Sequence, residues 1–190
     1  MPKIITDEEI FQAVIRVVTE RGYVGATTKE IAKAANISEV TLFRRFDNKL
    51  ELVKQAIEAT ISKTDFDAAT KYTGDVIADL IRVVNAYQGS AVKHGQLIFT
   101  LIVETLRHPE LNEILIMPLE IFGKVRSLIS RYQTEGILRK EHPMETLAAL
   151  LGPLMYSSML KNASSQDDIP ALEVERFVVR FLEGRFAENP

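Results

Sequence analysis

Apolar residues recur with helical periodicity along the whole chain of 190 residues. Near the N-terminus, Ile10, Ala13, Val14, Val17 and Val18 follow the i, i+3, i+4, i+7, i+8 spacing that places side chains on one face of an α-helix. No run of residues shows the sustained alternation, bounded by hairpin turns, that is typical of a half-buried strand. The sequence therefore predicts an all-α protein of about nine helices.

The first 61 residues predict four short helices, and each has its own start signal. Ser, Thr and Asn side chains at these starts can accept a hydrogen bond from a free backbone N–H of the first helical turn. The signals are Thr6 with Glu9, Thr27 with Glu30, Ser38 before a helix over 39–46, and Asn48 with Glu51. Ser62–Asp75 is polar and lacks periodicity, so we expect two domains, residues 1–61 and residues 62–190.

The second part predicts five longer helices. Their expected bounds are Gly74–Gln88, Ser90–Arg107, Pro109–Gln133 with a kink at Pro118, Met144–Lys161 and Ile169–Phe186, with a polar loop over Asn162–Asp168.

Composition excludes several classes of protein. The longest stretch without charge, Thr146–Leu160, is too short to span a membrane, which takes about 20 apolar residues. The chain has no cysteine and opens without a secretory leader, so we expect a cytoplasmic protein. Its formal net charge of −3 argues against coating nucleic acid through bulk charge but leaves room for a local basic surface.

The most informative segment is Thr27–Lys49, which predicts two short helices joined by the brief turn Ala35–Ser38. Such a pair makes a helix-turn-helix if the helices cross steeply. Asn36 suits the corner because asparagine tolerates the left-handed backbone conformation. Burial of Leu42 and Phe46 leaves the second helix to expose Glu39, Val40, Thr41, Phe43, Arg44 and Arg45.

The exposed residues have the chemistry of DNA recognition. A guanidinium group can hold guanine O6 and N7 bidentately or clamp a phosphate, and a threonine can meet a base edge or the thymine methyl group. Thr28 and Lys29 lie in the first turn of the preceding helix, where a phosphate can bind. Lys49 begins the fourth helix, where a docked phosphate would offset its unfavourable interaction with the helix dipole.

In its spacing, this segment resembles the DNA-binding domain of the tetracycline-repressor-like (TetR) family of bacterial transcriptional regulators. The residues that carry the resemblance are Gly22, Tyr23, Thr27, Thr28, Ile31, Ala32, Ala35, Ile37, Ser38, Thr41, Leu42, Phe46, Lys49 and Leu52. The resemblance implies DNA contacts from Thr28, Lys29, Glu39, Val40, Thr41, Phe43, Arg44, Arg45 and Lys49. Phe43 departs from the family's usual tyrosine, and the N-terminal arm contains only Lys3 as a basic residue.

The resemblance also predicts what residues 62–190 do. A two-fold DNA site requires a dimer, and in this family the last two long helices typically form the interface. The expected interface residues are Leu147, Ala148, Leu151, Gly152, Met155, Phe177 and Phe181, although core packing within one subunit would use the same residue types. A pocket for a small-molecule effector would be lined by Tyr87, His94, Phe99, Phe122, Met155, Tyr156 and Met159, each of which could equally be ordinary core. The segment Leu101–Leu111 resembles a stretch seen in several family members.

These expectations combine into a homodimeric bacterial regulator, a repressor rather than an activator, that binds a palindromic operator and is released by a small-molecule effector. No cofactor and no enzymatic activity are expected. Two alternatives stay open. One is a dimeric helical module that does not bind DNA; the other is a metal-dependent enzyme using Glu104 and His108, which are four residues apart on one predicted helix but lack a third ligand.

Overall fold

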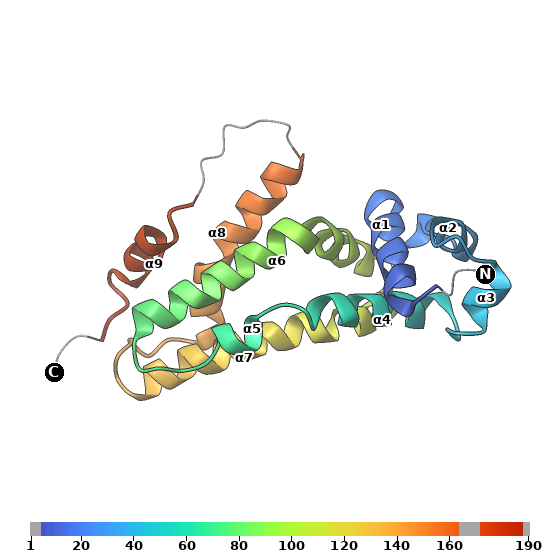
Figure 1. Cartoon of the computed structure of the whole chain (residues 1–190). Coiled ribbons are helices and arrows are strands. Elements are labelled where there is room, and N and C mark those ends of the chain that lie inside the picture. The colour runs from blue at the N-terminus through green and yellow to red at the C-terminus, as the bar shows by residue number, and fades with distance from the viewer. Residues whose placement is uncertain (1–4, 164–171, 188–190) are drawn as a thin grey trace. The chain divides into compact units, whose positions relative to one another are not determined.

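A computed structural model describes residues 5–163 and 172–187 and confirms an all-α protein (Figure 1). The described residues form nine α-helices and one 3₁₀-helix. In chain order these are α1 (Asp7–Gly25), α2 (Thr28–Ala34), α3 (Glu39–Phe43), α4 (Lys49–Ile61), α5 (Phe66–Ala69), α6 (Val76–Thr105), the 3₁₀-helix η1 (Pro109–Leu115), α7 (Ile116–Thr134), α8 (Pro143–Ala163) and α9 (Val174–Leu182). None of the described helices is long and apolar enough to cross a membrane.

The chain forms two compact units. Unit 1 comprises Met1–Lys63 together with Gln96–Pro118, and unit 2 comprises Thr64–Gly95 together with Leu119–Pro190. The last part of α6 and all of η1 therefore pack with the N-terminal helices rather than with α7, α8 and α9.

The helix starts of unit 1 follow the predicted signals. Thr6 and Thr27 form complete capping boxes with Glu9 and Glu30. The Ser38 and Asn48 side chains accept hydrogen bonds from the N–H groups of Thr41 (3.1 Å) and Glu51 (2.9 Å). Each start thus satisfies backbone donors that would otherwise lack a partner, which is why four separate helices fit into this short length.

The apolar stripe of α1 supplies one face of the core of unit 1. Its five predicted members are all buried, and α1 packs against α4 and α2. Phe46 is buried beside Phe11, with their ring centroids 5.7 Å apart. Helix α3 ends at Phe43, three residues before the expected end, but Leu42 O still accepts from the N–H groups of Arg45 and Phe46 at 3.0 Å. The backbone therefore stays tightly wound and keeps Phe46 in the core.

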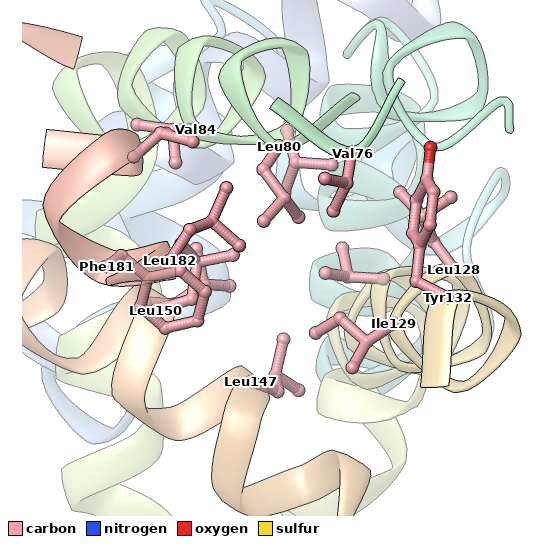
Figure 2. Packing of buried hydrophobic residues seen from close by; sticks show 14 of the residues in the cluster. Val76, Leu80, Val84, Leu128, Ile129, Tyr132, Leu147, Leu150, Phe181 and Leu182 are labelled. Atoms are coloured by element: carbon pink, nitrogen blue, oxygen red, sulfur yellow. The ribbon is translucent and has the colours of Figure 1, made fainter. Parts of the chain in front are cut away.

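The core of unit 2 lies between its four longer helices (Figure 2). The residues labelled there are Val76, Leu80 and Val84 of α6, Leu128, Ile129 and Tyr132 of α7, Leu147 and Leu150 of α8, and Phe181 and Leu182 of α9. One carboxylate, Asp79, is fully buried at this core. It accepts hydrogen bonds from Thr73 N–H (2.9 Å), the Tyr132 hydroxyl (2.5 Å) and the Arg82 guanidinium (2.6 Å), so the buried charge is compensated.

Two helix boundaries expected in the second part are wrong. Gly89 does not divide 74–107, because α6 continues through it; a glycine inside a helix costs only about 1 kcal/mol. Pro109 starts a 3₁₀-helix instead of a long α-helix. Pro118 is the third residue of α7, where a missing N–H leaves no intrahelical bond unmade.

The last helix also differs from its prediction. Helix α9 ends at Leu182 instead of Phe186, because Phe186 forms an isolated β-bridge with Leu138. The Arg139 N–H donates to Arg185 O (2.9 Å) and the Ala187 N–H donates to Ile137 O (3.0 Å). The expected helix start at Ile169, the loop residues 164–168 and Lys3 lie outside the described residues.

Candidate nucleic-acid interface

Helices α2 and α3 form a helix-turn-helix in unit 1. Asn36 occupies the corner with a φ of 55°, the left-handed conformation that its side chain tolerates. The Ile37 N–H donates to Ala32 O at 3.0 Å, which closes the turn. Ile31, Ala35 and Leu42 are buried as predicted, whereas Ile37 is only half-buried. One side of α3 therefore faces the core, and the other faces solvent.

The solvent-facing side of α3 is unusually apolar. Val40 is 71% exposed and Phe43 is 50% exposed. The adjacent Arg44 is exposed, and no hydrogen bond or ion pair holds its guanidinium group among the described residues. Two large apolar side chains exposed side by side on one helix, with a cation next to them, are typical of a binding surface.

The polar candidates near α3 differ in how freely they could meet DNA. The Thr28 hydroxyl donates to the Glu39 carboxylate, which ties the start of α2 to the start of α3. The Thr41 hydroxyl lies 2.8 Å from Ser38 Oγ, within the N-cap of α3. Lys29 is exposed and makes no ion pair with any described residue.

Arg45 is exposed, as the sequence predicted, but its guanidinium group, unlike that of Arg44, is held by described residues. Its Nη1 donates to Ile5 O (2.8 Å) and to Asp7 Oδ1 (3.0 Å) at the start of α1. A long side chain beyond the last turn of α3 can reach this neighbouring helix start, where Asp7 and the Ile5 carbonyl offer acceptors. Asp7 was not singled out by the sequence, because nothing in the local pattern links it to a residue 38 positions away.

Lys49 also has partners within the chain. Its ammonium group donates to Tyr23 O, lies 3.5 Å from Val24 O and stands 4.2 Å from the centre of the Tyr23 ring. Burial lowers the pKa of Lys49, and the nearby Glu104 carboxylate acts in the opposite direction. The ammonium group therefore lies against carbonyl groups at the C-terminal end of α1, where a positive charge is favoured.

The seven expected effector-pocket residues do not all lie in one unit. Phe99 belongs to unit 1, and the other six belong to unit 2. Tyr87 and Phe122 pack against the core of unit 2, and burial raises the pKa of the Tyr87 hydroxyl to about 12. His94 has a buried Nδ1 without a hydrogen-bond partner among the described residues, and burial followed by the charge of Lys93 lowers its pKa. Met155, Tyr156 and Met159 on α8 are exposed.

Three of the expected dimer-interface residues are instead core residues of the monomer. Leu147, Leu151 and Phe181 are buried in unit 2, and Phe177 packs against the same cluster. Ala148 and Met155 are exposed and Gly152 is half-buried. Helical geometry accounts for this difference: Leu147 and Leu151 lie on the face of α8 that the core of unit 2 covers, and Ala148 and Met155 lie on the exposed flank beside it.

The residues proposed for a metal site make other contacts. Glu104 Oε2 accepts a hydrogen bond from the Tyr23 N–H (2.6 Å), and His108 Nδ1 lies 3.4 Å from a Glu110 carboxylate oxygen. Within residues 5–163 and 172–187, no group of three His, Cys, Asp or Glu side chains could hold a metal ion.

A helix-turn-helix whose second helix exposes apolar and cationic side chains has the form of a DNA-binding module.

Residues 10–56 match the model of the family described as bacterial regulatory proteins, tetR family. The chain is 37% identical over 78 residues to the HTH-type transcriptional regulator YvkB of Bacillus subtilis, an alignment that spans 41% of each chain. It is 27% identical over 172 residues to the HTH-type transcriptional regulator Mb1581 of Mycobacterium bovis, spanning 87% of this chain and 83% of that one.

A solved structure has the same fold. The fatty acid degradation regulator FadR from Bacillus halodurans superposes with a TM-score of 0.69 at 19% identity, covering 96% of this chain and 95% of that chain. The family model identifies residues 10–56 as a domain of the tetR family of bacterial regulatory proteins, and the likeness to the solved structure shows the fold. The relatives are named as transcriptional regulators, not as enzymes.

Proposed function

We propose that the protein is a homodimeric repressor that binds a palindromic operator through α3 and is released when a small molecule binds within residues 62–190. The observation that carries the DNA-binding part is the outward face of α3. Val40 and Phe43 offer apolar contacts to sugars and thymine methyl groups, and Arg44 offers a free guanidinium fork. In this proposal α3 lies in the major groove, and Lys29 contacts the phosphate backbone.

The remaining predicted DNA contacts take supporting roles in this proposal. Thr28 and Glu39 hold each other, and Thr41 completes the N-cap of α3, so these residues shape the recognition helix. Phe43 lacks the hydroxyl group that would bind a phosphate in its tyrosine counterpart. Sequence discrimination would therefore depend mainly on Arg44, since one bidentate contact to guanine is worth about 1–3 kcal/mol.

The proposed dimer uses the outward face of α8. Met144, Met155, Tyr156 and Met159 are all exposed there, with Ala148 and Gly152 between them. Because the neighbouring face packs in the core of unit 2, apolar residues extend around much of α8, and a helix that is apolar all round is expected to be buried. A second copy of the chain would cover this face and present two copies of α3, which must reach major grooves about 34 Å apart.

The effector site is proposed within unit 2, around Tyr87, His94 and Phe122. The buried Nδ1 of His94 supports a ligand with a polar group, since a buried ring nitrogen without a partner has a free-energy cost that a hydrogen bond would remove. Release of DNA then requires that the ligand bind more tightly to a conformation that does not fit the operator.

Selection of duplexes from a random pool tests the DNA-binding proposal. We expect the purified protein to enrich an inverted repeat and to sediment as a dimer both free and bound to it. Affinity should fall steeply with salt concentration, because bound cations are released from the phosphates. Enrichment of a sequence without two-fold symmetry, or of none, would contradict the proposal.

A further inference from the structure

Helix α1 has a kink at Gly22, three residues before its end. Gly22 has φ 72° and ψ 171°, so the regular helix breaks one residue before Tyr23. The break takes the Tyr23 N–H and the carbonyl groups of Tyr23 and Val24 out of the helical hydrogen-bond ladder. Buried or half-buried groups of this kind need other partners.

Glu104 supplies the partner for the N–H group. Its Oε2 accepts from the Tyr23 N–H at 2.6 Å, the short distance typical of a charge-assisted hydrogen bond. The backbone angle at Gly22 favours glycine, and a Cβ atom there would lie 2.4 Å from Glu104 Oε1, so a larger residue would displace this carboxylate. Glu104 lies in the last turn of α6, which belongs to the same unit as α1.

Lys49 supplies the partner for the carbonyl groups. Its ammonium group donates to Tyr23 O, with Val24 O at 3.5 Å. The ring of Tyr23 lies under the same ammonium group, 4.2 Å from ring centre to Nζ. The backbone of Tyr23 is thus held by an anion at its N–H and by a cation at its C=O.

We propose that Glu104 and Lys49 are positioning residues that clamp the Tyr23 backbone and thereby fix α2 and the start of α4 on either side of the recognition helix α3. Neither role requires a contact with DNA. This inference rests on the proposed function of α3. It assigns a role to the segment Leu101–Leu111, and it differs from the expectation that Lys49 binds a phosphate.

The proposed clamp accounts for the opposite charges of Glu104 and Lys49, which bind the Tyr23 N–H and C=O groups. A neutral donor and acceptor could satisfy the same backbone groups, but hydrogen bonds to ionised groups are about twice as strong. Lys49 is the first residue of α4, only six positions after Phe43, so its anchor limits how far the end of α3 can move. Glu104 fixes the other side of the turn from a distant part of the chain.

Amide hydrogen exchange of the full chain without DNA tests the clamp directly. Glu104→Ala should speed exchange of the Tyr23 N–H by about tenfold or more, because a charged hydrogen bond is lost. Glu104→Gln keeps an acceptor oxygen and should restore much of the protection. Glu113→Ala, an exposed substitution on η1, is the matched control and should leave Tyr23 unchanged. Equal exchange in the wild type and in Glu104→Ala would overturn the clamp.

DNA binding then tests the role of Lys49. The probe is the duplex that the wild-type protein selects from a random pool, and affinity is measured over a range of salt concentrations. Lys49→Gln should weaken binding by about tenfold without changing the salt dependence, whereas Lys29→Gln should reduce the slope by about 0.9, the value for one phosphate contact. An equal loss of slope in Lys49→Gln would show that Lys49 binds a phosphate and would overturn this part of the proposal. If the wild type selects no duplex, the proposed function fails, and the exchange measurement still decides the clamp.

Discussion

Arg45 and Asp7 form an ion pair across the surface of unit 1, with Nη1 and Oδ1 3.0 Å apart. The same guanidinium nitrogen also donates to Ile5 O at 2.8 Å. Two adjacent arginines at the end of the recognition helix therefore have different environments: Arg45 is held by the start of α1, and Arg44 is held by no described residue.

The difference predicts unequal effects of two alanine substitutions on DNA binding. Arg44→Ala should cost about 1–3 kcal/mol of binding free energy and relax discrimination at one base position, because it removes the free guanidinium fork. Arg45→Ala should cost less, because its guanidinium group is already held by Ile5 O and Asp7 Oδ1. Titration of both variants with the selected operator measures this order. A larger loss for Arg45→Ala would mean that Arg45 leaves Asp7 when DNA binds.

Substitution of the N-cap residue of α2, Thr27, should lower the stability of the fold. Thr27→Ala removes the acceptor of the Glu30 N–H (3.2 Å) and should lower the free energy of unfolding by about 1 kcal/mol. Thr27→Ser keeps the hydroxyl group and serves as the control. Urea unfolding monitored by circular dichroism gives both values, and equal midpoints for the alanine and serine variants would contradict a capping role.

Asp79 predicts that stability depends on pH. Burial raises the pKa of this carboxyl group, but hydrogen bonds from Thr73, Tyr132 and Arg82 outweigh burial, and the net pKa in the folded state is lowered. A lowered pKa means that the ionised form stabilises the fold. This contribution is present above the pKa of the unfolded chain, about 3.9, and is lost as the pH falls through the lower pKa of the folded state.

The measurement for Asp79 is chemical unfolding at neutral and acidic pH. Asp79→Asn should be less stable than the wild type by about 1–3 kcal/mol at pH 7, because Arg82 and its neighbours lose a charged acceptor. The difference should shrink towards acid as the wild-type carboxylate becomes protonated. Asp75→Asn, an exposed substitution nearby, is the control. A difference that stays constant with pH would show that the Asp79 charge has no part in stability.

Substitutions on the buried and the exposed face of α8 should affect different properties, folding stability and dimer formation. Leu151 is 2% exposed, so Leu151→Ala should lower the free energy of unfolding by about 2–5 kcal/mol through a cavity in unit 2. Tyr156 is 63% exposed, so Tyr156→Glu should leave the fold intact and weaken the proposed dimer. Sedimentation velocity and thermal unfolding separate the two effects. Retention of the dimer in a Tyr156→Glu, Met159→Glu double variant would place the interface elsewhere.

Local signals in the sequence determined where the helices of unit 1 begin. Capping at Thr6, Thr27, Ser38 and Asn48 depends on hydrogen bonds within three residues of one another, so it can be predicted without any knowledge of the fold. The same holds for the buried stripe of α1 and for the left-handed Asn36. The motif of the DNA-binding domain was recognisable for this reason, since its positions serve local structure and one contiguous surface.

Only the tertiary structure decided which partner a side chain contacts when that partner is distant in the sequence. Leu147 and Leu151 were compatible with a dimer interface or with the core, and the volume left by α6, α7 and α9 assigned them to the core. Arg45, Lys49 and Glu104 were compatible with DNA or metal contacts from their sequence pattern, and in the structure each of them also contacts a group on α1. Helical periodicity gives the direction of a side chain relative to its own helix. The partner of that side chain can belong to another element, as Glu104 lies 81 residues from Tyr23, and only the packed structure brings the two together.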